Sequence, residues 1–306
     1  MWKRIKSIGS ISIVENPCGI TFVPIKQLQT IMAVVDTHQL SSFIRDCNID
    51  MKSRHGCAEI DRITVIDNDM IVLCDNTESR LLVYNDNNQY QIKTKYNQSD
   101  ITTIPGTNTV VVSSDNSEYI QFIDIVKKEV YNEIHIPGSQ HGGMAASNTN
   151  LFVGSKGLVH VLDHQGHPIR KIKTKKEDRT LLYITLCSHG NIWYSDFFSL
   201  YCIKLDGKEV FTYITSPDLR GIVCITTDNH GNVYIVGYNS YNIHRFRSDG
   251  TLIDIILSKE HNIRCPRTCC FNRNYTKLYV SNNAGTVLSV FNVVCFKQCW
   301  YSTFCI

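Results

Sequence analysis

Short apolar runs alternate with turn-forming residues along this chain, and the pattern is clearest between Arg220 and Ile256. There the runs GIVCITT, NVYIVG, NIHRFR and TLIDII are separated by DNHG, by YNSY and by the hairpin dipeptide Asp249-Gly250. Asp at the start and Gly at the end of a turn suit type I geometry, and β-branched and aromatic residues favour strands. The stretch therefore predicts a meander of four antiparallel strands.

The same unit recurs along most of the chain. The runs that align with NVYIVG have successive centres 39, 41, 41, 41 and 45 residues apart. These centres are Val72, Val111, Phe152, Trp193, Tyr234 and Tyr279. A turn signal precedes each centre and another apolar run follows it, so the steady spacing indicates six copies of one structural repeat.

The runs are apolar on nearly every residue rather than on alternate residues, so both faces of each predicted sheet must be covered. Strand-only repeats of this length, each covered by its neighbours, are typical of β-propellers. Helical periodicity is absent, which excludes helical repeat arrays. The sequence predicts an all-β, six-bladed β-propeller of four-stranded antiparallel blades. A seventh blade that uses residues 18–50 is the alternative.

The predicted organisation has three parts. Residues 1–42 are expected to form a leader or linker with partial extended structure, residues 43–294 the propeller, and residues 295–306 an apolar tail rich in cysteine and aromatic residues. The sixth copy lacks a clear fourth strand. Either residues 43–51 or the tail would supply it, which would latch the first and last blades together and hide two sheet edges.

Composition indicates an ordinary soluble globular protein, with 43% hydrophobic and 19% charged residues among 306. The net charge of +3 is too small to indicate nucleic-acid binding by itself.

The 13 cysteines are odd in number and fall mostly within predicted strands, which favours reduced thiols in a cytoplasmic protein. No signal peptide or membrane span is expected. The C-x3-C pairs Cys265/Cys269 and Cys295/Cys299 are interpreted as structural, so no zinc is expected.

The predicted inner strands read ITVID, ITTIP, GGMAAS, LYITLC, GIVCIT and TCCFN, and none contains Glu. Some six-bladed propellers, such as lactonases, hold a metal on the axis with carboxylate and amide side chains, and these strands argue against such a cage. No nucleophile-elbow, zincin or P-loop motif occurs. We therefore expect a non-enzymatic protein without a cofactor, and a metal-dependent lactonase-like hydrolase is the remote alternative.

The segment Gly221 to Gly250, with its D-x-x-G-N-V-Y and N-I-x-x-F-x-x-D-G patterns, resembles an NHL repeat. The stretch 43–294 is similar to the NHL propeller at the C-terminal end of tripartite-motif proteins, in particular the expanded set of bivalve molluscs. The segments SIGSISIV and QTIMAVV are similar to the linker that precedes the propeller in those proteins. The resemblance implies the substrate-receptor end of a ubiquitin ligase. RING and B-box cysteine spacing and coiled-coil heptads are absent from this sequence.

One propeller face is expected to carry the loops between second and third strands together with the loops between blades. Exposed Tyr, Phe and Arg are enriched at binding hot spots, so this face is predicted to bind a protein or peptide partner. The candidate residues are Phe197, Phe198, Arg220, Tyr238, Tyr241 and Arg267. Because some NHL propellers bind RNA, single-stranded or stem-loop RNA is the alternative partner. Its candidate contacts are Lys156, Lys175, Lys176, Arg179 and Arg264.

Overall fold

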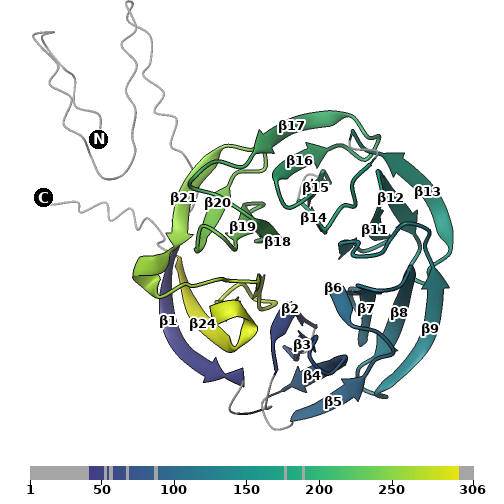
Figure 1. Ribbon diagram of the computed structural model, residues 1–306, viewed down its shortest axis with the longest axis horizontal. Coiled ribbons are helices and arrows are strands. Elements are labelled where there is room, and N and C mark those ends of the chain that lie inside the picture. Colours follow the sequence, from purple (N-terminus) through teal and green to yellow (C-terminus); the bar gives the residue numbers. More distant parts are fainter. Residues whose placement is uncertain are drawn as a thin grey trace, which may run out of the picture. The chain divides into compact units, whose positions relative to one another are not determined.

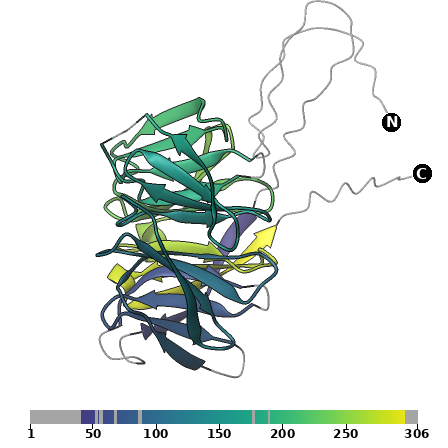
Figure 2. The same cartoon turned by 90° about the vertical axis from the view of Figure 1, so that its right-hand side faces the viewer.

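Each predicted meander folds into a four-stranded antiparallel sheet, and six such sheets form a ring (Figure 1). The chain is represented by a computed structural model that describes residues 41–51, 54, 58–66, 69–85, 89–175, 178–187 and 190–295. The unit Ser41–Cys295 contains the whole propeller, and Figure 2 shows it from the side. The expected leader segment 1–40 and tail segment 296–306 lie outside the described residues. The six-bladed all-β prediction is confirmed.

Blades 1 to 5 are meanders in chain order, with the first strand innermost. Blade 1 contains β2 (Ile60–Val65), β3 (Ile71–Asp75), β4 (Arg80–Tyr84) and β5 (Gln89–Lys93). Blade 2 contains β6 (Gln98–Thr103), β7 (Thr109–Ser114), β8 (Tyr119–Asp124) and β9 (Glu129–His135). Blade 3 contains β10 (Met144–Ala146), β11 (Leu151–Ser155), β12 (Leu158–Leu162) and β13 (Pro168–Lys173).

Blade 4 contains β14 (Tyr183–Leu186), β15 (Ile192–Ser195), β16 (Ser199–Ile203) and β17 (Glu209–Ile214). Blade 5 contains β18 (Ile222–Thr227), β19 (Val233–Gly237), β20 (Asn242–Phe246) and β21 (Leu252–Leu257). Two 3-10 turns, η1 (Lys259–His261) and η2 (Asn283–Gly285), belong to loops of the last blade.

Blade 6 combines both ends of the described chain. It contains β22 (Thr268–Phe271), β23 (Lys277–Asn282), β24 (Val287–Cys295) and, as its outermost strand, β1 (Ser41–Asp50). Of the two segments that the sequence left open for this position, the N-terminal one pairs antiparallel with β24 along nearly its whole length. Phe43 then packs edge-on against Tyr234 of blade 5, with ring centroids 6.0 Å apart. The ring is thus closed by a strand from the opposite end of the sequence.

The core lies between the blades rather than within any one of them. Six apolar clusters form, each between two adjacent sheets. Successive residues of a middle strand point to opposite neighbours. In β15, for example, Trp193 packs toward blade 5 and Tyr194 toward blade 3. Two-sided packing explains why these strands are apolar at every position.

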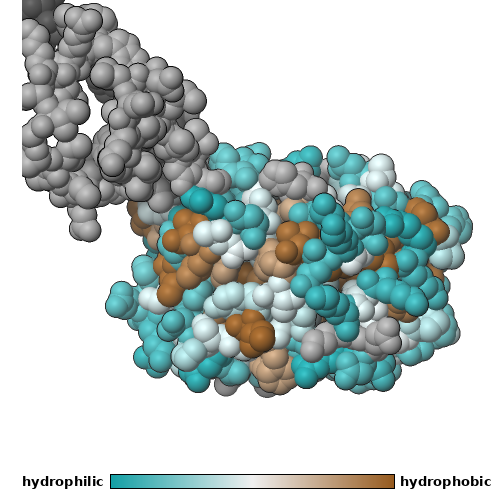
Figure 3. Space-filling view, turned by 90° about the horizontal axis from the view of Figure 1, so that it is seen from above, coloured by the Kyte–Doolittle hydropathy of each residue, from teal (hydrophilic) through white to brown (hydrophobic). Residues whose placement is uncertain are grey.

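The outermost strands have one wet face, and their patterns alternate accordingly. β17 reads as alternating half-buried and exposed residues, and Ile214 at its end is 75% exposed. Seen along the rim in Figure 3, hydrophobic residues lie in separate small patches among hydrophilic ones. Such scattered apolar side chains are normal for a protein surface. No helix in the described part of the chain is long and apolar enough to cross a membrane.

Candidate functional site

Strands alternate in direction within each blade, so loops after the second strand and loops between blades open on the same side of the ring. We call this side the loop face. All the described candidate residues belong to these two kinds of loop and therefore lie on it. Lys176 lies outside the described residues. The face predicted for partner binding is thus formed as the topology requires.

Backbone hydrogen bonds join three of these loops into one continuous surface on blades 4 and 5. The amide of Ile222 donates to the carbonyl of Phe197 at 3.0 Å. The amide of Tyr238 donates to Gly221 at 2.9 Å, and that of Asn239 donates to Arg220 at 3.1 Å. Neighbouring loops therefore hold each other in place, and Phe197, Arg220 and Tyr238 come together although they are separated in sequence.

Aromatic side chains extend this surface at both ends. Phe198 is 58% exposed, and its ring meets that of Phe197 edge-on at 5.2 Å. The guanidinium of Arg179 lies 5.5 Å from the centre of the Phe198 ring and pairs with Asp196 at 3.0 Å. A cation over an aromatic face is favourable and orders both groups. Arg179, which the sequence offers as a possible RNA contact, is thereby held against the aromatic surface.

Tyr241 forms the blade 5 end of the surface. The ammonium of Lys259 lies 4.9 Å from the centre of the Tyr241 ring. A hydrogen bond with the Cys265 thiol raises the pKa of the Tyr241 phenol. We call the set Arg179, Phe197, Phe198, Arg220, Tyr238 and Tyr241 the aromatic arc.

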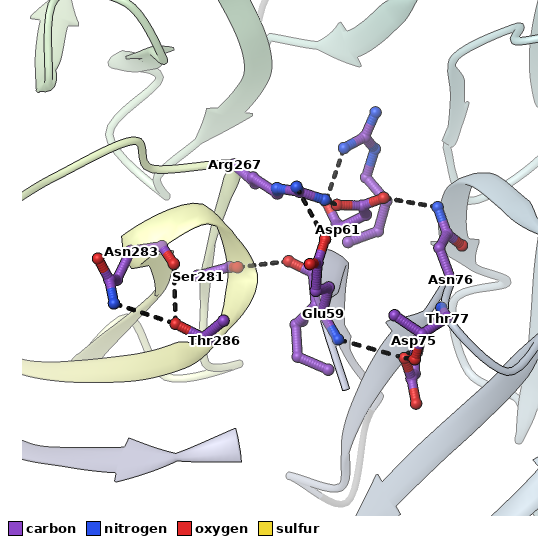
Figure 4. Close-up of polar contacts among 11 residues, drawn as sticks. Glu59, Asp61, Asp75, Asn76, Thr77, Arg267, Ser281, Asn283 and Thr286 are labelled. Atoms are coloured by element: carbon purple, nitrogen blue, oxygen red, sulfur yellow. Dashed lines mark hydrogen bonds and ion pairs between the residues drawn. The ribbon is translucent and has the colours of Figure 1, made fainter. Parts of the chain in front are cut away.

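Arg267, the remaining partner candidate, is held in an ion-pair clasp between blades 6 and 1 (Figure 4). Its guanidinium pairs with Asp61 and, at 3.0 Å, with Glu59. The Asn76 amide donates to the second Asp61 oxygen at 2.6 Å. Two carboxylates therefore already neutralise this charge. The clasp joins residues about two hundred positions apart in sequence.

The other basic candidates divide into paired and unpaired groups. Lys175 pairs with Glu209 at 2.5 Å. Lys156, Arg220 and Arg264 are exposed and have no ion-pair partner within the described ranges. The loop face therefore carries isolated cations rather than a continuous basic track.

The axis of the ring holds a cavity of about 210 Å³, lined by the six inner strands. Arg62, Asp100 and Tyr183 are in its wall, and the first two directly precede the predicted inner strands ITVID and ITTIP. The Nε atom of Arg62 lies 3.5 Å from an Asp100 oxygen. Its guanidinium also lies 4.7 Å from the ring centre of Tyr183, which belongs to the opposite blade. The other Asp100 oxygen accepts the amide of Met144 at 2.7 Å.

A backbone irregularity explains why sequence reasoning missed these residues. The pairing of inner and second strands shifts register between Ile60 and Arg62, and again between Gln98 and Asp100. Such a β-bulge inserts one residue and redirects the side chains that follow. The residue after each bulge therefore lines the axis. The sequence signal is a charged residue directly before each of the predicted inner strands ITVID and ITTIP.

Burial shifts the pKa values of the charged residues in the cavity wall. Loss of water raises the pKa of Asp100 to about 6, against an ordinary value of 3.8, although Arg62 pulls in the opposite direction. Burial also acts to lower the pKa of Arg62, but the nearby acidic groups Tyr183, Asp100 and Asp61 outweigh it and the net shift is upward. Arg62 is thus permanently charged, whereas Asp100 changes its charge near neutral pH. Within the described residues no group of three or more His, Cys, Asp or Glu side chains could hold a metal ion.

Comparison with known proteins identifies the fold and no family. No family model matches the chain, and no curated protein matches it. Among solved structures, virginiamycin B lyase from Staphylococcus aureus is similar at 12% identity with a TM-score of 0.60, over 83% of this chain and all of that one. A catalytically inactive variant of that lyase with quinupristin gives 13% identity and a TM-score of 0.57, over 84% of this chain and 99% of that one. A streptogramin B lyase gives 15% identity and a TM-score of 0.58, over 76% and 78%. At such identities the likeness supports the propeller fold alone.

Proposed function

We propose that this chain is a non-enzymatic recognition propeller of the NHL type, and that its aromatic arc binds an extended segment of a partner protein. The observation that carries the proposal is that Phe198 and Arg220 are both exposed on neighbouring loops joined by backbone hydrogen bonds, and that Arg220 has no ion-pair partner within the described ranges. Large aromatic and Arg side chains dominate binding energy at interfaces. A surface ordered before binding loses less entropy when the partner arrives.

The chemistry of the arc favours a peptide with an apolar or aromatic side chain next to an acidic one. The apolar group would cover Phe198, and the carboxylate would pair with Arg220, which no described acidic residue neutralises. Arginine binds carboxylates through two parallel hydrogen bonds. In a tripartite-motif ligase this segment would belong to the ubiquitination substrate.

Protein recognition is preferred to RNA recognition because of the charge pairing. Lys175, Arg179 and Arg267, which an RNA-binding face would need, are each within an ion pair with a carboxylate. RNA affinity depends on cations that are free to neutralise phosphates. The eight cysteines whose side chains the structure describes are all free thiols, which supports a reducing compartment such as the cytoplasm.

The proposal is tested by selecting peptides from a displayed library and measuring their dissociation constants by fluorescence anisotropy. Phe198→Ala, Arg220→Ala and Tyr238→Ala are each expected to weaken binding about tenfold or more, or about 1.4 kcal/mol. Tyr131→Ala, which removes a 52% exposed aromatic on the outer strand β9, is the matched control and should bind normally. Equal losses in arc and control variants would contradict the proposal. Salt-sensitive binding of single-stranded RNA that survives the arc substitutions would favour the RNA alternative.

A further inference from the structure

Two thiols from neighbouring inner strands meet in the wall of the axial cavity. Cys224 is on β18 and Cys269 is on β22, and both line the cavity. The Cys224 sulfur lies 3.5 Å from the Cys269 carbonyl oxygen, and the two thiols are also hydrogen-bonded to each other. The Thr268 hydroxyl lies 3.4 Å from the Cys224 sulfur and donates to it. Cys224 thus donates to the Cys269 carbonyl and accepts from the Thr268 hydroxyl, at a place that small molecules in the cavity can reach.

The two thiols differ in their tendency to ionise. The hydrogen bond from Cys269 lowers the pKa of Cys224 to about 7, and the Thr268 hydroxyl and the Arg62 charge act in the same direction. The same hydrogen bond, together with burial, raises the pKa of Cys269. The thiolate is the reactive form of cysteine, and cations and donors favour it. Cys224 is therefore suited to be the nucleophile, and Cys269 is suited to resolve the product.

We propose that Cys224 and Cys269 are a redox-active pair that reduces small hydroperoxides and becomes a disulfide between blades 5 and 6. A cavity of about 210 Å³ has room for several water-sized molecules, so hydrogen peroxide can enter. This inference does not depend on the proposed partner recognition.

The chemistry proceeds in two balanced steps. The Cys224 thiolate attacks one peroxide oxygen, the O–O bond breaks, and the departing oxygen takes a proton from solvent to leave as water or an alcohol. Cys224 is then a sulfenic acid. Cys269 loses its proton and attacks the Cys224 sulfur, the S–S bond forms, and hydroxide leaves with that proton as water. Both thiols are oxidised by two electrons in total, and one peroxide is reduced.

The molecule contains its own comparison pair. Cys187 and Cys202 are also neighbours in an apolar cluster, the one between blades 4 and 5, but they do not line the cavity. Cys224 and Cys269 belong to the cluster between blades 5 and 6 and line the cavity as well. Burial, with a smaller contribution from Cys187, raises the pKa of Cys202 to about 12. A thiol with a raised pKa and no access to the cavity is not expected to react. If the protein simply lost its structure, both cysteine pairs would be oxidised. The proposed chemistry oxidises only Cys224 and Cys269.

The experiment uses the full chain with Cys47→Ser, because Cys47 is an exposed thiol on β1. Reduced protein is treated with hydrogen peroxide under native conditions, alkylated, digested with trypsin and analysed by mass spectrometry. The expected product links peptide Gly221–Arg245 to peptide Thr268–Arg273, and fragment spectra assign Cys269 rather than Cys270. Cys187 and Cys202 share one tryptic peptide, so their disulfide would be recognised in the same digest. Cys224 is expected to react at least about tenfold faster than Cys202.

Two isosteric variants distinguish the nucleophilic role of Cys224 from the resolving role of Cys269. Cys269→Ser is expected to stop at the Cys224 sulfenic acid, which dimedone traps, and Cys224→Ser is expected to remove both the sulfenic acid and the disulfide. Wild-type rates alone also decide the question, so a variant that fails to fold does not weaken the test. Equal reaction rates for the two pairs, or a disulfide that forms only after unfolding in urea, would overturn the proposal.

Discussion

Replacing Asp100 with Asn removes the one carboxylate among the described residues that line the axial cavity, while keeping the shape of the side chain. The Asn side-chain oxygen can still accept the amide of Met144, so the main hydrogen bond survives. What changes is the charge opposite Arg62. Two effects compete here, since breaking a buried ion pair commonly destabilises by about 3–5 kcal/mol, whereas removing a poorly solvated charge stabilises.

The shifted pKa decides which effect is larger. In the folded protein the pKa of Asp100 is about 6, against 3.8 ordinarily, so the folded state binds this proton more tightly than the unfolded state. The stability that protonated Asp100 contributes is complete below pH 3.8 and is lost as the pH rises through 6. A shift of about two units corresponds to about 3 kcal/mol. Ionised Asp100 therefore destabilises the fold at neutral pH despite Arg62, and a neutral Asn is expected to relieve this.

The assay is urea unfolding of wild type and Asp100→Asn at pH values on both sides of this window. The difference in unfolding free energy, variant minus wild type, is expected to rise by about 3 kcal/mol between about pH 4 and pH 7. Taking the difference cancels carboxylates whose pKa is lowered, such as Glu118 and Asp249, which make the wild type less stable in acid. The double variant with Arg62→Met measures the coupling directly. A difference that stays constant, or that falls by 3 kcal/mol at neutral pH, would refute the reasoning.

Two further predictions concern contacts between elements. Arg245, whose side chain is 1% exposed, pairs with Asp254 at 2.6 Å and donates to Ser41 of the closing strand β1. Its replacement by Ala is expected to lower the unfolding free energy by about 2–4 kcal/mol, since Asp254 is partly solvated. Lys95→Ala, at an exposed ion pair, should leave the urea midpoint unchanged, and equal effects would contradict this view. A Cβ at Gly143 would lie 2.6 Å from the backbone of Tyr183 in the next blade. Gly143→Ala is therefore expected to lower the unfolding free energy by about 1–3 kcal/mol or more. Gly106 has open space around it but a φ of +75°, so Gly106→Ala measures backbone strain without a clash. A thermal melt that ranks Gly106→Ala below Gly143→Ala would argue against the close packing.

The fold was predictable because the same packing requirement repeats in every blade. Every blade must be apolar on both faces to pack between two neighbours, so the spacing of runs such as those at Trp193 and Tyr234 reveals the ring. The loop face followed from strand direction alone. The clasp at Arg267 was not predictable in the same way, because its partners Glu59 and Asp61 lie at the other end of the described chain. Sequence reasoning identified Arg267 as exposed and cationic, whereas ring closure half-buries and neutralises it.

The axial residues escaped prediction for a reason that applies to any repeat fold. Packing constrains the positions that face neighbouring blades, so the copies resemble one another there. The positions that face the axial cavity contact neighbouring blades through individual polar pairs, such as Arg62 with Asp100 and Cys224 with Cys269, and these pairs need not be the same in every copy. Arg62, Asp100 and Cys224 each follow a bulge at the same place in three different blades, yet they carry a cation, an acid and a thiol. Similarity between copies therefore predicts the architecture, and differences between copies at matched positions indicate where the chemistry of the ring is concentrated.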